Sequence, residues 1–372
     1  MELKTTKLEC LLIADDLTGA CDAAVQFARR GCRTSVHLDS DSEDTGVLAV
    51  SAESRHLSVA ELRPVMDKLA RRLPVDRARI LFKKIDSTLR GNVGAEIAAA
   101  LVAFGCDAAV IAPAFPAMGR IVEGGYLRVG AAEAIDLAAH LGLVPCAHVS
   151  PSALYAAIEA GGRFLSVDAT CDRDLDAIAA AGLRSGRRIL WAGSAGLASA
   201  LARTLPWGGP LVLEPPPGTA PRPVAAVLFC IGSNHPVTVE QQRHLLAHCA
   251  AHSLGPETAT PSAIVSPLGR GEHVVLNLPV RETSVERVRE LVGNAAGAAG
   301  ALVLSGGDTA SLVCRALGVR RIRLEDEIVA GIPWGYLSGG AFDGVRVATK
   351  SGGFGALHAL IQVADFFTCP TP

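Results

Sequence analysis

The sequence predicts an α/β protein with two domains, and three observations support this prediction. Short apolar runs alternate with longer Ala- and Leu-rich segments of helical period, which is typical of parallel sheets covered by helices. The chain has 372 residues, a length that suits about two domains. A Pro-rich stretch, 206–223, interrupts the alternation and favours a linker. We therefore expect Rossmann-like domains with mainly parallel sheets at 1–205 and 224–372, and an active site in an interdomain cleft.

Strands and helices are expected in turn through the first domain. The apolar runs predict strands at Leu8–Ala14, Thr34–Leu38, Val47–Val50, Ile80–Lys83, Ala108–Ala112, Phe164–Val167 and Ile189–Trp191. The helical period predicts helices at Thr18–Arg30, Ser58–Arg72, Val93–Phe104, Ser152–Ala160, Arg173–Ala181 and Ala195–Thr204. The residues after Pro116 are less regular, and we expect a surface excursion there.

The alternation resumes in the second domain. We expect strands at Val224–Ile231, Val274–Leu278, Ala301–Leu304, Arg320–Leu324 and Val345–Thr349. Helices are expected at Thr238–Ala250, Val285–Ala296, Ala310–Leu317 and Phe354–Ala364.

Composition excludes several classes of protein. Hydrophobic residues make up 49% and charged residues 19%, which excludes a disordered chain. The formal net charge of -2 gives no broad field for nucleic acid or an anionic membrane. The ten cysteines lack metal-site spacing, so we expect free thiols in a reducing cytosol. We expect no signal peptide and no membrane span, hence a cytoplasmic protein, and the oligomeric state, a homo-oligomer included, stays open.

Two acids, Asp15 and Asp16, follow the first predicted strand and precede a helix. Ligands of open parallel sheets bind beyond the carboxyl ends of the strands, so these carboxylates could orient a hydroxyl, accept its proton or hold a metal. The alternative is helix capping, in which Asp16 or Thr18 accepts hydrogen bonds from the first backbone N–H groups. Asp22 falls on the helix itself, and we expect it to be structural.

A dense polar segment, residues 83–92, follows the strand that begins at Ile80. Two lysines, an acid, two hydroxyls and an arginine so close together suit a carboxylate or polyol ligand. Arg55 follows another strand and could clamp a carboxylate with two hydrogen bonds, although a surface arginine would look the same in the sequence. The Pro- and Gly-rich stretch 113–130 is either a substrate lid or a connection.

Three glycine-containing loops follow strands of the second domain: residues 232–235, 305–309 and 350–355. Glycine lets backbone N–H groups approach an oxyanion, and the start of a helix favours negative charge. One such turn is weak support, but three in one domain indicate a nucleotide. The sequence contains neither a GxxxxGK[ST] P-loop nor a protein-kinase GxGxxG loop, so neither of those ATP architectures is expected.

Together these segments resemble the four-carbon acid sugar kinase family over nearly the whole chain. IADDLTGACDAA, SAESRHLS, KKIDSTLRGNVGAEI and APAFPAMGR are similar to its sugar-binding domain, and LVLSGGDTA, EIVAGIPWG and ATKSGGFG to its nucleotide-binding domain. The resemblance implies ATP-dependent phosphorylation of a four-carbon acid such as threonate, erythronate or 3-oxo-tetronate, at the terminal hydroxyl. It is most specific in the stretch from Lys83 to Glu96.

The resemblance also implies which residues bind each ligand. The sugar acid would contact the two acids of the first turn and residues of the polar segments: Asp15, Asp16, Arg55, Lys83, Lys84, Ile85, Asp86 and Ser87, to which we add Arg90. The nucleotide would contact the glycine loops: Ser233, Gly306, Gly307, Asp308, Thr309, Lys350, Ser351, Gly352 and Gly353.

A mechanism follows as a hypothesis, because phosphoryl transfer depends mainly on positioning and charge neutralisation. We expect Arg55 and Lys84 to hold the substrate carboxylate, and one of Asp15, Asp16 or Asp86 to accept the proton of the attacking hydroxyl. Mg²⁺ would neutralise the developing charge, although the sequence identifies no metal ligand. Two alternatives stay open: a sugar-acid isomerase or dehydratase, and a non-catalytic sensor of a sugar acid or nucleotide.

Overall fold

The structure is a computed structural model that describes residues 8–38, 46–130, 132–205 and 224–369. The described chain forms two compact units: residues 8–34 and 46–205 make the first, and residues 35–38 and 224–369 the second. The linker expected at 206–223 lies outside the described residues. The predicted domain boundaries and the interdomain cleft therefore stay predictions.

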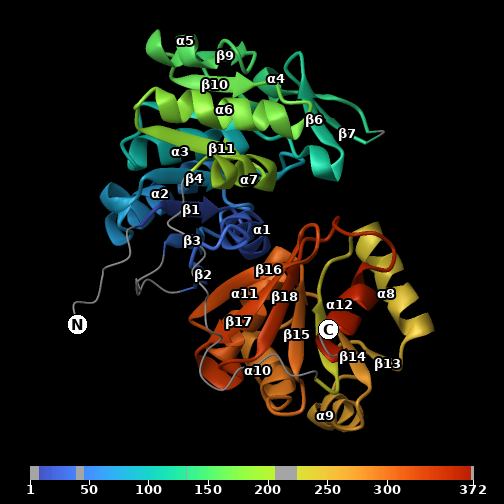
Figure 1. Ribbon diagram of the computed structural model, residues 1–372. Helices are drawn as coiled ribbons and strands as arrows, with labels where there is room; N and C mark the ends of the chain where they lie inside the picture. Colours follow the sequence, from blue (N-terminus) through green and yellow to red (C-terminus); the bar gives the residue numbers. More distant parts are fainter. Residues whose placement is uncertain (1–7, 39–45, 131, 206–223, 370–372) are drawn as a thin grey trace. The chain divides into compact units, whose positions relative to one another are not determined.

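A parallel sheet forms the centre of the first unit (Figure 1, blue to green). Its strand order is β3 (Val47–Ser51), β1 (Cys10–Ala14), β4 (Ile80–Lys84), β11 (Ile189–Gly193), β5 (Ala108–Ala112), β10 (Phe164–Val167) and β9 (Cys146–Val149). β1 and β5 are apolar and buried along their whole length, as expected for parallel strands with helices on both faces.

Two rows of helices cover this sheet. One row contains α1 (Leu17–Ala28), α7 (Ala195–Thr204), α6 (Asp172–Arg184) and α5 (Leu154–Glu159), and the other α2 (Val59–Arg72), α3 (Val93–Ala103) and α4 (Leu137–Leu141). The rows lie on opposite faces, because successive residues of β4 contact α3 and α1. Two 3₁₀ turns, η1 (Val75–Arg77) and η2 (Pro116–Met118), lie in the connections.

The expected surface excursion contains more regular structure than we predicted. β6 (Arg120–Glu123), β7 (Tyr126–Val129) and β8 (Ile135–Asp136) form a small antiparallel sheet. We missed these strands and β9 because they are short and partly exposed, so no continuous buried apolar run marks them, and glycines lie between β6 and β7.

A mixed sheet forms the centre of the second unit (Figure 1, yellow to red). Its parallel part has the order β13 (Ala251–Leu254), β14 (His273–Asn277), β12 (Val227–Ile231), β15 (Ala301–Ser305) and β18 (Arg346–Lys350). β17 (Ile332–Ser338) and β16 (Arg321–Val329) follow as an antiparallel hairpin. Residues 35–38, which include most of β2 (Thr34–His37), group with this unit beside β16.

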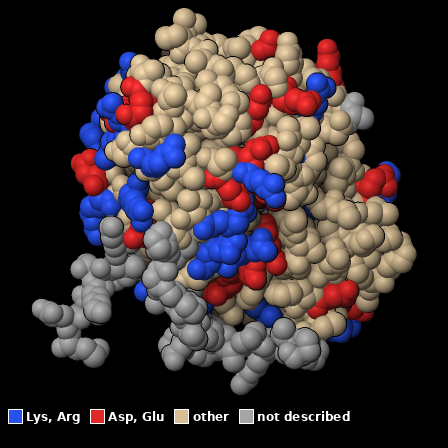
Figure 2. All heavy atoms as spheres, turned by 45° about the horizontal axis from the view of Figure 1, so that its top comes forward, with Lys and Arg blue, Asp and Glu red and all other residues tan. Residues whose placement is uncertain are grey.

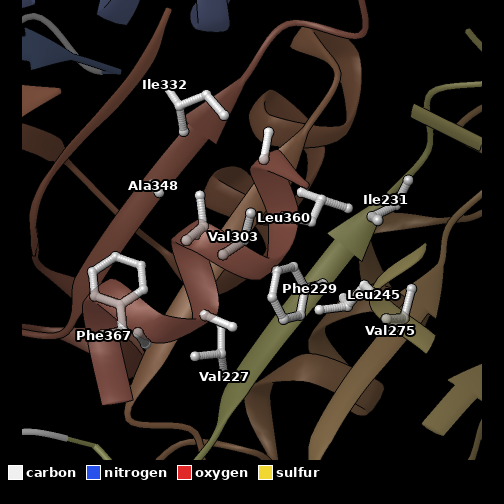
Figure 3. Close-up of a cluster of buried hydrophobic side chains, with 14 residues drawn as sticks. Val227, Phe229, Ile231, Leu245, Val275, Val303, Ile332, Ala348, Leu360 and Phe367 are labelled. Atoms are coloured by element: carbon white, nitrogen blue, oxygen red, sulfur yellow. The ribbon is translucent and has the colours of Figure 1, made fainter. Parts of the chain in front are cut away.

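Alternation along the strands distributes the core of the second unit over both faces of its sheet. Val227, Phe229 and Ile231 of β12 point to one face, where they pack with residues of α8 (Pro236–His248) and α12 (Ala359–Thr368), such as Leu245 and Leu360 (Figure 3). The intervening Leu228 and Cys230 are fully buried on the other face. α9 (Pro261–Gly269), α10 (Val285–Gly293), α11 (Gly307–Leu317) and the 3₁₀ turn η3 (Gly340–Phe342) complete the unit.

Two expectations for the second unit need correction. The last helix begins at Ala359 rather than Phe354, because residues 351–358 form a loop in which Gly355 has a φ of +86°. The strand predicted at Arg320–Leu324 continues to Val329 and returns as β17, which we missed together with β13 and α9. Register shifts at Leu324/Asp326 and Glu327/Val329 break the alternation that would have marked β16 as one strand.

The surface agrees with the weak net charge. On the face shown in Figure 2, basic and acidic side chains lie interspersed among a larger area of uncharged residues. All ten cysteines are free thiols. Among the described helices, none has both the length and the apolar character that crossing a membrane requires.

Candidate functional site

In the first unit, three polar loops meet at one edge of the sheet. β3, β1 and β4 are neighbouring parallel strands, so their carboxyl ends lie side by side. Asp15 and Asp16 follow β1, Arg55 lies in the loop after β3, and Asp86 lies in the loop after β4. The packing is close: a Cβ on Gly91, whose φ is +86°, would lie 3.0 Å from the carbonyl oxygen of Arg55. The sequence placed these residues at strand ends, and the structure brings them together.

Arg55 is the centre of this cluster. Its Nε and Nη2 each lie 2.7 Å from Oδ2 of Asp15. Its Nη1 lies 2.5 Å from Oδ2 of Asp16, and its Nη2 lies 3.2 Å from Oδ2 of Asp86. One guanidinium thus contacts all three acids that we considered as proton acceptors.

The cluster shifts the pKa values of its members in different directions. Burial and then the charge of Asp15 raise the pKa of Asp16, although Arg55 opposes them. Burial acts to raise the pKa of Asp86, but hydrogen bonds and charges from Arg90 and Arg55 outweigh it, and this pKa lies well below the usual range. Burial would lower the pKa of Arg55, yet the three acids outweigh it and raise this pKa.

The carboxylate oxygens of the three acids differ in their hydrogen-bond and ion-pair partners. Asp86 uses both, because Oδ1 accepts from the backbone N and Oγ1 of Thr88, and Oδ2 from Nη2 of Arg90 at 2.6 Å. Asp16 also uses both, because Oδ1 caps α1 by accepting from the N–H of Gly19 at 2.5 Å and Oδ2 pairs with Arg55. The capping alternative is therefore confirmed for Asp16, alongside its ion pair.

Asp15 is the exception. Its Oδ1 is buried and has no hydrogen-bond partner within the described part of the chain. Gly19 lies next to this oxygen: a Cβ there would lie 3.6 Å from Oδ1 of Asp15 and 3.6 Å from Nζ of Lys84. An acceptor without a partner and an ammonium group thus lie on either side of Gly19, a pairing that suits a hydroxyl of a ligand.

The two lysines at the end of β4 have separate surroundings. Nζ of Lys83 is fully buried and lies 2.9 Å from Oε2 of Glu96 on α3. Nζ of Lys84 donates to the carbonyl of Ile85 at 2.9 Å and lies 3.8 Å from Oδ2 of Asp22 on α1. The side chain of Ile85 is itself buried in the core. Only Lys84 shares the side of β1 and α1 on which Asp15 and Gly19 lie.

The loop after β4 also contacts a residue that the sequence did not single out. Nη1 of Arg120, at the start of β6, donates to Oγ of Ser87. Burial lowers the pKa of Arg120, although the charges of Asp86 and Asp22 oppose that effect. The only signal in the sequence was the motif APAFPAMGR, in which we weighed the loop as a whole and not its arginine.

In the second unit, the three glycine loops meet in the same way. They follow β12, β15 and β18, which are neighbouring parallel strands. A Cβ on Gly306 would lie 3.3 Å from Oγ1 of Thr309 and 3.6 Å from Cβ of Ser233. A Cβ on Gly353 would lie 3.2 Å from Nε2 of His235. Glycine at these positions thus lets the loops lie close to one another.

The second loop opens a helix. Gly306, with a φ of +103°, precedes α11, whose first turn contains Gly307, Asp308 and Thr309. Backbone N–H groups at the start of a helix lack partners within it and favour an anion. Thr309 is buried against the first loop, while Asp308 is exposed.

Lys350 holds the third loop in place through hydrogen bonds. This side chain is fully buried, and its Nζ donates to Oγ1 of Thr238 at 3.0 Å and to the carbonyls of Ser351 and Gly352 at 3.2 and 3.1 Å. Burial lowers the pKa of Lys350 to about 7. We missed Thr238 and its neighbour Gln241, because only the fold brings α8 beneath this loop.

Few of the described side chains are candidates for binding a metal ion. Within the described residues, no group of three or more His, Cys, Asp or Glu side chains is placed to hold a metal ion. Mg²⁺ bound with a nucleotide needs less, because it keeps several waters and uses phosphate oxygens with one or two carboxylates. Exposed Asp308 at the start of α11 fits that smaller demand.

Comparison with known proteins gives two matching families. A family described as the sugar-binding N-terminal domain matches residues 10–148 and 133–201. A family described as the nucleotide-binding C-terminal domain matches residues 264–360. The first match contains the Arg55 cluster, and the second contains the second and third glycine loops.

Relatives named as sugar-acid kinases match nearly the whole chain. The D-threonate kinase of Bordetella bronchiseptica is 36% identical, over 95% of this chain and 96% of the relative. The D-erythronate kinase of Heliobacterium modesticaldum is 29% identical, over 96% of each chain. The 3-oxo-tetronate kinase of Cupriavidus necator is 27% identical, over 92% of this chain and 93% of the relative.

A solved structure shares the fold. A Salmonella typhimurium LT2 protein, described as a proposed tRNA synthase, has a TM-score of 0.76 at 21% identity and covers 97% of this chain and 100% of its own. That identity is low enough that the likeness shows the fold alone. The relatives and the two domain families show more: this chain belongs to the four-carbon acid sugar kinase family.

Proposed function

We propose that this chain transfers the γ-phosphate of ATP to the terminal hydroxyl of a four-carbon sugar acid, with D-threonate as the first candidate. The observation that carries the proposal is the 36% identity to a D-threonate kinase over nearly the full length of both chains. D-Erythronate and 3-oxo-tetronate are the next candidates, because relatives at 29% and 27% identity act on them.

The first unit would bind the sugar acid. Asp15, Asp86 and Arg55 offer a mixed set of acceptors and donors at the sheet edge, which suits a polyol. Arg55 already contacts three carboxylates, so we assign it to ordering the acids rather than to the substrate carboxylate. For that carboxylate we propose two arginines. Arg120 lies beside Ser87, and the side chain of Arg90 is 61% exposed.

Asp15 is our candidate for the proton acceptor. Its Oδ1 is a buried acceptor without a hydrogen-bond partner among the described residues, whereas both oxygens of Asp16 and of Asp86 are occupied. In the reaction, the substrate oxygen forms a bond to the γ-phosphorus and the bond from that phosphorus to the bridging oxygen of ADP breaks. The hydroxyl proton passes to the carboxylate of Asp15.

The second unit would bind ATP. Three glycine loops, one of them at the start of α11, present backbone N–H groups suited to phosphate oxygens. Asp308 would hold Mg²⁺ together with the phosphates, and the ion would neutralise charge on the transferring group. We place the enzyme in the cytoplasm, where ATP and reduced thiols occur together.

An assay of ADP release tests the proposal. The purified protein is incubated with ATP, Mg²⁺ and each of D-threonate, D-erythronate and 3-oxo-tetronate, and the product is identified by mass spectrometry. We expect ADP and a phosphorylated acid in equal amounts with at least one substrate, and none with erythritol, which has the hydroxyls but no carboxylate. Conversion of the acid without ADP would favour the isomerase or dehydratase alternative, and binding without turnover would favour the sensor.

A further inference from the structure

The loop after β18 is held in place from one side by three buried polar side chains. Lys350 is the last residue of β18, and Thr238 and Gln241 lie one turn apart on α8. Lys350 and Thr238 are fully buried, and Gln241 is 1% exposed. Buried polar groups are costly unless their bonds are made, so this arrangement requires partners, and the loop supplies them.

Backbone carbonyls of the loop are those partners. Nζ of Lys350 donates to the carbonyls of Ser351 and Gly352, and Oγ1 of Thr238 donates to the carbonyl of Gly352 at 2.6 Å. Nε2 of Gln241 lies 3.0, 2.9 and 2.9 Å from the carbonyls of Phe354, Gly355 and Ala356, beyond Gly353. Five carbonyls of one loop are therefore turned toward α8 and the end of β18.

The direction of the carbonyls fixes the direction of the amides. In a trans peptide the C=O and the following N–H point in opposite directions. The carbonyls of Ser351 and Gly352 point toward Nζ of Lys350, so the N–H groups of Gly352 and Gly353 point away from it. These two amides belong to the loop that we expect to contact phosphate.

In its protonated form, Lys350 also brings a positive charge to this loop. Within the described residues, no carboxylate lies within ion-pair distance of its Nζ, so its charge is balanced only by dipoles. A cation at the carbonyl oxygen polarises the peptide and strengthens the N–H on its far side as a donor. Two peptides are polarised in this way.

We propose that Lys350, Thr238 and Gln241 are positioning residues for ATP, and that Lys350 acts on the phosphates through the peptides of Gly352 and Gly353. The inference rests on the proposed function, because it takes ATP as the anion. It differs from the expectation that Lys350 touches the nucleotide.

Thr238 offers the sharpest test, because its hydroxyl contacts the loop and Lys350 but would not contact the ligand. Thr238→Val keeps the shape and removes the hydroxyl, and Thr238→Ser restores it. On the full chain, calorimetry should show ATP binding weakened about tenfold in Thr238→Val, equivalent to about 1.4 kcal/mol, and recovered in Thr238→Ser. The KM for ATP should rise with it while the KM for the sugar acid stays constant.

Two neighbouring glutamines provide a matched pair. Gln241→Met removes the donor to three loop carbonyls, whereas Gln242→Met removes an amide that bonds to Asn277 instead. We expect weaker ATP binding in Gln241→Met only, with both variants folded by circular dichroism. Equal ATP affinity in wild type, Thr238→Val and Gln241→Met would overturn the positioning role alone. Absence of ATP binding by the wild-type chain would overturn the proposed function, and the inference with it.

Discussion

Asp15→Asn is the most informative perturbation of the Arg55 cluster. The amide keeps one oxygen for Arg55 but puts either a donor NH₂ or a weakly basic oxygen where Oδ1 now lies, so it cannot accept the proton. General-base catalysis contributes about 10²- to 10⁴-fold, and we expect kcat to fall by that factor. Leaving a buried charge unpaired costs about 3–5 kcal/mol. Arg55 still pairs with Asp16 and Asp86 in this variant, so the loss of stability should be well below that value.

The assay is ADP release at saturating ATP and sugar acid, with calorimetric binding of ATP and thermal unfolding as controls. Asp16→Asn is the matched variant, because asparagine caps α1 as well as aspartate does and the change removes one charge from the same cluster. We expect it to lose much less activity than Asp15→Asn. If Asp15→Asn retained wild-type kcat, or if Asp16→Asn were the more damaged of the two, Asp15 would not be the base.

Three further predictions concern single positions. Gly19→Ala places a methyl 2.8 Å from Oδ1 of Asp16 and beside Asp15, so the KM for the sugar acid should rise severalfold; an unchanged KM would exclude a ligand there. Arg120→Met should raise the KM for the sugar acid about tenfold or more without affecting that for ATP, whereas exposed Arg128→Met on the same hairpin should change neither. Lys350 binds its proton more weakly in the folded state, where its pKa is lowered from 10.5 to about 7. The free energy of unfolding of the wild type, relative to that of Lys350→Met, should therefore increase between about pH 7 and 9. The increase should be at most about 1.4 kcal/mol per pH unit. Denaturant titrations that gave a constant difference would contradict the buried, charge-disfavouring environment of Lys350.

Strand ends were the part of the site that sequence reasoning located best. β1, β4 and β15 begin with continuous apolar runs, so the polar residues that follow these runs could be identified without coordinates. Because carboxyl ends of neighbouring parallel strands meet at one edge, their convergence followed from the strand order. The sequence did not contain that order, and this is why the loops stood as separate candidates.

The partners of each side chain could not be predicted. Arg55 is about forty residues away from Asp15, and nothing local indicates that it pairs with three acids rather than with a ligand. Thr238 and Gln241 lie more than a hundred residues from the loop carbonyls they hold. Helical periodicity marks them as core-facing at most. Contacts of this range depend on how β12 and β18 are placed in the sheet, which propensity and pattern do not encode.

The segment from Lys83 to Glu96 shows how a motif can be specific for a structural reason as well as a chemical one. Successive residues of a strand face opposite sides, so the polar pair at the end of β4 divides: Lys84 faces α1, and Lys83 faces α3. Lys83 meets Glu96 there, in the first turn of α3, and both side chains are almost fully buried. The first and last residues of the segment are thus tied to each other, and the loop between them carries Asp86. A buried ammonium without its acid would cost several kcal/mol, so the two ends are constrained as a pair. The polar residues of this segment therefore have two roles: some hold the ends of the loop together, and others line the site. The alternation of side chains along β4 decides which lysine has which role.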